Sequence, residues 1–152
     1  MEKSVLQKQQ PNKLIFYGIL LFLLGLIVGL FIPLMSNPRM GLSSHIEGVL
    51  NGMFLVILGL IWHKIALSDR WLKITFWLAV YGTFANWLGM LYAALVNAGK
   101  DLTIAAEGKE GTPLQEGIFS FLLITLSLAM IIICITVLIG LKRNIKRGSK
   151  AS

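Results

Sequence analysis

Four long stretches almost free of charged residues determine what this chain can fold into. They cover residues 14–35, 46–62, 71–96 and 114–141, and contain only Glu47, Lys73 and Glu116 as charged side chains. A helix needs about 20 mainly apolar residues to cross the roughly 30 Å hydrocarbon core of a bilayer. Charged residues make up only 14% of the chain, against about 25% in soluble domains. The sequence therefore predicts an all-α integral membrane protein, a four-transmembrane-helix bundle forming a single domain over residues 1–152.

The first stretch has one competing interpretation, a cleaved signal peptide, because Lys3, Lys8 and Lys13 precede it. It is too long for the apolar region of a signal peptide. It also runs into Pro33 and Pro38 rather than into a small-residue cleavage site. We therefore interpret it as a retained transmembrane helix.

The basic residues predict the orientation of the bundle. With the N-terminus inside, eleven of the 14 lysines and arginines face the cytoplasm, as the positive-inside bias requires. These residues are Lys3, Lys8, Lys13, Lys64, Arg70, Lys73, Lys142, Arg143, Lys146, Arg147 and Lys150. We expect a multi-pass protein of the cytoplasmic (inner) membrane with both termini inside. Anionic lipid is the nearer partner for this charge, and no nucleic-acid partner is expected.

Polar side chains in apolar spans are costly and indicate function. Most of them lie toward the predicted outer ends of the second, third and fourth spans, where they could line one cavity. They are His45, Glu47, Asn51, Asn86, Tyr92, Glu116 and Ser120. We also expect Ser43 or Ser44 to cap the second helix, with Glu47 as the partner in a capping box.

His45 shares one helix face with a strip of small residues. At about 100° per residue, Gly48, Gly52 and Gly59 fall within roughly 60° of it. The strip has two interpretations: a flat slot for a porphyrin with His45 as axial ligand, or a close helix-packing surface of the GxxxG kind. His63 lies about 27 Å further along the same helix, too far to share a site. A haem on His45 would thus keep an open position for substrate.

Two blocks of sequence carry a family resemblance. Residues 37–53, which include His45, Glu47 and Asn51, and residues 76–87, which end in Asn86–Trp87, resemble the hydroxylaminobenzene mutases. The resemblance to styrene oxide isomerase, a four-helix membrane enzyme, is more distant and extends to residues 116–121.

The resemblance implies a function and a cofactor. A mutase of this family converts an aryl hydroxylamine such as hydroxylaminobenzene, an intermediate of nitroaromatic degradation, to an ortho-aminophenol. The styrene oxide isomerase likeness implies haem b, His45 as its ligand, a homotrimer and Asn51 on the substrate side. Tyr92 lies two positions away from where that family has an active-site tyrosine.

A mechanism follows from these expectations. Ferric haem would act as a Lewis acid on the hydroxyl oxygen of a small aromatic substrate, with Gly48 and Gly52 beside the macrocycle. Asn51 and Asn86 would orient the substrate, and Glu47 or Glu116 would move the ring proton. Because residues two apart on a helix point about 200° from one another, Glu47 would reach a neighbouring protomer's slot rather than the slot of its own His45.

Three other functions remain open at this point. The first is an epoxide-to-aldehyde isomerase on the same scaffold. The second is a small multidrug exporter, for which Glu47 and Glu116 would lie unusually close to the membrane surface. The third is an electron-transfer subunit, which would usually need a second haem ligand. The single cysteine, Cys134, is interpreted as a small buried hydrophobic residue.

Overall fold

Residues 5–149, the part of the chain that the computed structural model describes, are almost entirely helical. Within this part, four helices are long and apolar enough to cross a membrane, which confirms the predicted fold class. The elements are α1 (Val5–Phe31), η1 (Ile32–Leu34), α2 (Pro38–Ile61), η2 (Trp62–Lys64), α3 (Asp69–Val96), η3 (Lys100–Leu102), α4 (Thr103–Ala106) and α5 (Pro113–Gly148).

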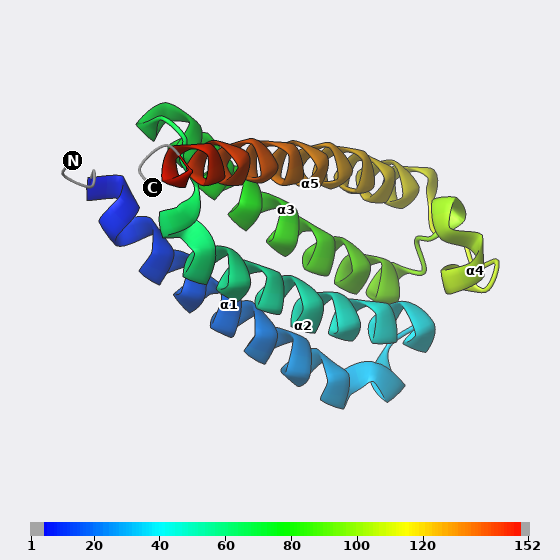
Figure 1. The fold of residues 1–152 in the computed structure, drawn as a ribbon. Helices are drawn as coiled ribbons and strands as arrows, with labels where there is room; N and C mark the ends of the chain where they lie inside the picture. The colour runs from blue at the N-terminus through cyan, green and yellow to red at the C-terminus, as the bar shows by residue number, and fades with distance from the viewer. Residues whose placement is uncertain (1–4, 150–152) are drawn as a thin grey trace.

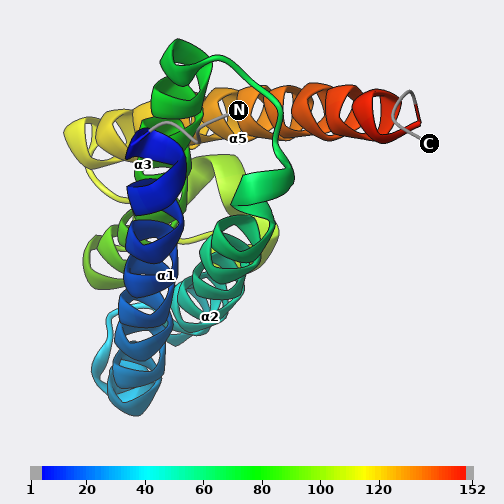
Figure 2. The same cartoon turned by 60° about the vertical axis from the view of Figure 1, so that its left-hand side comes forward.

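The long helices pack in chain order rather than in a closed square. α1 packs on α2, α2 on α3 and α3 on α5, with a smaller contact between α1 and α3, and Figure 1 shows them in this order across the view. Figure 2 shows α5 lying across the direction of α1. α2 and α5 face each other over a groove of about 280 Å³, the α2–α5 groove. Its lining residues are Phe54, Ile57, Leu58, Ile61, Ile133, Cys134, Val137 and Leu138.

The two ends of the bundle differ in charge. The start of α1, the α2–α3 connection and the C-terminal part of α5 lie toward the same end of the bundle (Figure 1), and we refer to this as the basic end. The opposite end carries η1, η3 and α4 and is the loop end. Lys13, Arg70 and Arg143 lie on segments at the basic end, in agreement with the predicted grouping of basic residues. Lys3 and Lys150 lie outside the described residues, and the cytoplasmic orientation stays a prediction.

The second helix begins earlier than the sequence analysis predicts, at Pro38 instead of residue 46. Its N-cap is Asn37, whose side-chain oxygen accepts from the Met40 amide at 3.2 Å. The expectation of a Ser43 or Ser44 cap is wrong: Ser43 Oγ donates to the Arg39 carbonyl and Ser44 Oγ to the Trp87 carbonyl. An asparagine followed by proline starts a helix well because it satisfies one free N–H and avoids another.

The other long helices also extend beyond the apolar stretches. α1 begins at Val5 rather than at residue 14, and α5 ends at Gly148 rather than at residue 141. The added residues include many lysines, arginines and glutamines, which have high helix propensity. α3 ends at Val96, as predicted, because Asn97 adopts a left-handed conformation with φ of 60°.

Glycines on facing sides bring α1 and α2 into backbone contact. A Cβ added to Gly48 would lie 2.6 Å from the Gly25 Cα, and one added to Gly52 would lie 2.7 Å from the Gly18 carbonyl oxygen. At Gly59 it would lie 2.9 Å from the Pro11 carbonyl oxygen. The glycine strip of α2 is therefore covered by α1 and is not an open slot. This is the close packing of small residues that is typical of membrane helices.

This contact leads to a stability prediction. We expect Gly52→Ala to lower the free energy of unfolding by about 1–3 kcal/mol, because overpacking against a backbone forces the helices apart. The measurement is thermal or denaturant unfolding in detergent. Gly89→Ala is the matched control, because its Cβ would make only an ordinary 3.8 Å contact with Leu122. Equal stability of the two variants would contradict the packing role.

Candidate functional site

The predicted haem ligand, His45, lies within α2 and faces α1. Its Nδ1 atom is 2.8 Å from the Gly25 carbonyl oxygen. The side chain lines a groove of about 550 Å³ between α1 and the loop-end half of α2, the α1–α2 groove. The other lining residues are Leu23, Leu26, Ile27, Gly29, Leu30, Ile32 and Leu42. His45 is thus the one side chain of this groove that offers a metal-ligating atom.

A second polar group lies between α2 and α3. The Glu47 Oε2 atom accepts from the Asn51 side-chain amide at 2.9 Å and from the Asn86 side-chain amide at 2.6 Å. The structure thus brings together three of the predicted catalytic residues, which we call the Glu47 cluster. Both amides donate to the same carboxylate oxygen, and Oε1 has no hydrogen-bond partner among the described residues.

His45 and the Glu47 cluster lie on different sides of α2. His45 contacts α1, whereas Glu47 contacts Asn86 of α3. Because α2 begins at Pro38, both residues lie well inside a 24-residue helix and not at its end, where the sequence analysis placed them. Positions 47, 51, 54, 58 and 61 share one helix face by their spacing of three and four. The Glu47 cluster therefore sits on the face of α2 that continues into the α2–α5 groove.

Glu116 does not join the Glu47 cluster. Its carboxylate is buried and accepts from the backbone amides of Gly99, Lys100 and Gly111 at 2.6–3.1 Å. These amides belong to the loop between α3 and α5. In the structure, Glu116 therefore holds this loop together through its backbone amides. Proton transfer by Glu116 stays a prediction, which this geometry does not favour.

Replacing Glu116 tests this position. Glu116→Gln leaves only one accepting oxygen for three amides, so we expect a loss of about 1–3 kcal/mol in stability and faster proteolysis of residues 97–112. Turnover by the protein that remains folded should change little. A loss of turnover without a loss of stability or protease resistance would instead make Glu116 catalytic.

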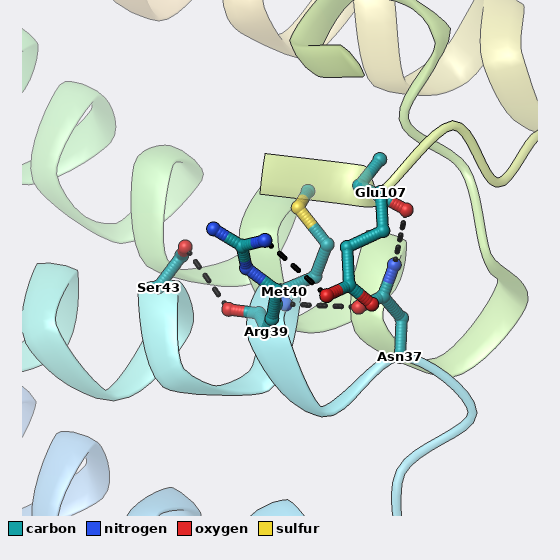
Figure 3. A network of polar contacts seen from close by, with 6 residues as sticks. Asn37, Arg39, Met40, Ser43 and Glu107 are labelled. Atoms are coloured by element: carbon teal, nitrogen blue, oxygen red, sulfur yellow. Dashed lines mark hydrogen bonds and ion pairs between the residues drawn. The ribbon is translucent and has the colours of Figure 1, made fainter. Parts of the chain in front are cut away.

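The loop between α3 and α5 is tied to the start of α2. The Asn37 side-chain amide donates to the Ala106 carbonyl at 3.1 Å, and the Asn37 backbone amide donates to the Ala94 carbonyl at 2.9 Å. Figure 3 shows the side-chain contacts of Asn37 together with the ion pair between Arg39 and Glu107, 3.2 Å long. Asn37 is fully buried and joins α2, α3 and α4. The sequence analysis did not predict this junction.

The remaining predicted residues occupy separate surroundings. Tyr92 packs against the buried residues around Met40 and Phe119, without a side-chain hydrogen bond among the described residues. Ser120 donates to Asp101 at the loop end. Cys134 is exposed rather than buried, since it lines the α2–α5 groove. The expected single cavity therefore separates into distinct places, and only Glu47, Asn51 and Asn86 meet.

Comparison with known proteins gives the family. The family model of styrene oxide isomerase matches residues 10–142. The chain is 53% identical over 132 residues to the hydroxylaminobenzene mutase HabB of Ectopseudomonas oleovorans, covering 86% of this chain and 80% of HabB. It is 50% identical over 127 residues to HabA of the same organism, covering 83% of this chain and 94% of HabA. No solved structure matches. The chain belongs to the styrene oxide isomerase family, is a homologue of the hydroxylaminobenzene mutases, and is an isomerase.

Proposed function

We propose that this protein is a membrane-bound, haem-dependent isomerase that rearranges aryl hydroxylamines to ortho-aminophenols. The observation that carries the proposal is the 53% identity to a hydroxylaminobenzene mutase over 132 residues. His45, Glu47, Asn51 and Asn86 all lie within the region that the family model matches, residues 10–142. The substrate class is a small aromatic compound that dissolves in the bilayer.

The α1–α2 groove fits haem b by the chemistry of its residues. The Gly25 carbonyl can only accept, so the neutral His45 carries its proton on Nδ1 and keeps the lone pair of Nε2 free for iron. The groove is otherwise apolar, as a macrocycle face requires. When bound there, the haem supplies a Lewis-acidic iron for the hydroxyl oxygen of the substrate.

The Glu47 cluster supplies hydrogen bonds and a base. The Asn51 and Asn86 amides hold one oxygen of the Glu47 carboxylate and can orient the N–OH group of the substrate. The other oxygen of Glu47 is available to remove the proton from the ortho carbon once oxygen has arrived there. Phe54 and Leu58 on the same face of α2 offer apolar contact to the arene. Excluding water there protects the electron-poor ring from hydrolysis.

The placement of His45 and Glu47 on opposite sides of α2 favours a site shared between copies. The α1–α2 groove of one protomer would face the Glu47 cluster of its neighbour, since one protomer alone does not bring the two together. A ring of copies satisfies this head-to-tail arrangement, and we propose a homotrimer in the cytoplasmic membrane.

An epoxide-to-aldehyde isomerase is the second candidate. The observation in its favour is the match of 133 of the 152 residues, 10–142, to the styrene oxide isomerase model. Both reactions need a Lewis acid at oxygen and an apolar cage for a cationic carbon framework. The higher similarity to two mutases favours the first candidate.

A comparison of substrates tests the proposal. We expect detergent-purified protein with a Soret band to convert hydroxylaminobenzene to 2-aminophenol, and to convert styrene oxide at least about tenfold more slowly in kcat/KM, a difference of about 1.4 kcal/mol. In ¹⁸O-labelled water, the aminophenol oxygen should carry no label, because the hydroxyl oxygen is transferred within the molecule. Faster conversion of styrene oxide would favour the second candidate, and full labelling would overturn intramolecular transfer.

A further inference from the structure

Two glycines of α1 surround the imidazole of His45. The Gly25 carbonyl oxygen lies 2.8 Å from Nδ1. A Cβ added to Gly29 would lie 2.7 Å from Nδ1 and 3.1 Å from Cε1 of the ring. Cβ atoms in proteins essentially never lie closer than 3.0 Å to such a neighbouring atom. Only glycine at position 29 therefore leaves room for the ring in its present place.

This contact fixes the chemical form of the histidine. A carbonyl oxygen has no proton to give, so the shared hydrogen must sit on Nδ1. In the neutral ring, Nε2 is then bare and can bind a metal. A carbonyl acceptor on the far nitrogen also orients a metal-binding imidazole. Free histidine exchanges between both tautomers, so the α1 backbone selects the one in which Nε2 is the bare nitrogen.

The position of the Gly25 carbonyl depends on the packing of α1 and α2. A Cβ added to Gly25 would lie 2.8 Å from the Val49 amide nitrogen, and one added to Gly48 would lie 2.6 Å from the Gly25 Cα. The backbones of α1 and α2 are thus in contact one turn from His45. A shift of α1 by one residue would turn this carbonyl by about 100° and remove it from the ring.

We infer that Gly25 and Gly29 of α1 are positioning residues for His45, which hold its imidazole as the Nδ1–H tautomer with Nε2 free for a metal. The inference rests on the proposed haem function for its purpose, but the tautomer itself is a property of the chain alone. Gly25 acts by its carbonyl and Gly29 by the absence of a side chain.

The tautomer is measured by ¹⁵N-histidine NMR on the full-length, cofactor-free protein in detergent, purified from cells that cannot make haem. The variant His63→Gln leaves His45 as the only histidine, so every imidazole signal belongs to it. We expect one protonated nitrogen, Nδ1, and one bare nitrogen, Nε2. A signal from Nε2–H, or averaging between both tautomers, would overturn the inference without any variant at position 29.

Gly29→Ala in the same background tests the space beside the ring. The added methyl group should displace the imidazole, lose the single-tautomer spectrum and weaken haem binding at least about tenfold, as expected for changes around a ligand. Gly89→Ala, on α3 with only an ordinary 3.8 Å contact, should keep the wild-type spectrum and haem affinity. An unchanged tautomer in folded Gly29→Ala would refute the role of Gly29.

The two proposals fail in different ways. If the wild-type protein holds the Nδ1–H tautomer but binds no haem in a titration followed at the Soret band, the haem function is wrong and the positioning of His45 stands. If haem binds while the cofactor-free protein shows free exchange between tautomers, the positioning inference is wrong and the haem function stands.

Discussion

His45→Ala is expected to lose both the Soret band and isomerase activity, with turnover falling to background. His45 is the only side chain in the α1–α2 groove with a metal-ligating atom. In the proposed function His45 would hold the iron, so its loss would remove both the haem and the Lewis-acid chemistry that the haem would supply. Absorbance of the detergent-purified variant, followed by an assay with hydroxylaminobenzene, measures the two effects separately.

His63→Ala is the matched control for this substitution. His63 lies in η2 at the basic end of the bundle, beyond the opposite end of α2 from the α1–α2 groove. We expect a full Soret band and unchanged turnover. A full Soret band in the His45 variant would refute the ligand assignment, and loss of the band in both variants would point to a general effect on folding.

Glu47→Gln is expected to lower kcat about 10²–10⁴-fold, the usual contribution of a general base, while the Soret band stays. Glutamine suits this test because Asn51 and Asn86 both donate to one carboxylate oxygen. The single carbonyl oxygen of glutamine can accept both hydrogen bonds, so the cluster is kept and only the base is lost. Turnover and the thermal unfolding midpoint are measured together.

Glu107→Gln makes the same chemical change at an exposed ion pair with Arg39. Exposed pairs contribute about 0–1 kcal/mol, so turnover and stability should hardly change. If Glu47→Gln keeps wild-type turnover, the ring proton leaves to another acceptor and Glu47 only holds the two asparagines. If it instead unfolds, Glu47 is a structural residue of the α2–α3 contact.

The four spans could be predicted from the sequence because apolar length alone determines them, and α3 even ends where its apolar stretch ends. The start of α2 could not be found in this way. Asn37 and Pro38 lie outside the apolar stretch, and the Asn37 cap is supported by carbonyls of α3 and α4 that are distant in sequence. Asparagine followed by proline is a cap signal, but Ser43 and Ser44 lie nearer to the apolar stretch and carry a cap signal as well.

The candidate site was predicted in part for a similar reason. Glu47 and Asn51 are four residues apart on one helix, so their contact follows from helix geometry. The meeting with Asn86 depends on how α3 lies against α2, which spacing along one helix does not specify. The surroundings of Glu116 could not be predicted because its partners are backbone amides of a loop, which carry no sequence signal. In the sequence alone, Gly48 and Gly52 fit either a slot for a porphyrin or a helix-packing surface. Only the position of α1 in the structure shows that they pack against a helix. Their contact with a cofactor stays a prediction.

The row-like packing of the helices affects how a substrate reaches the protein. An apolar groove runs along the sides of α2 and α5. A compound that dissolves in the bilayer can therefore enter sideways, directly from the lipid phase. The concentration that governs saturation is then the amount of substrate per lipid or detergent molecule, and not its concentration in the buffer.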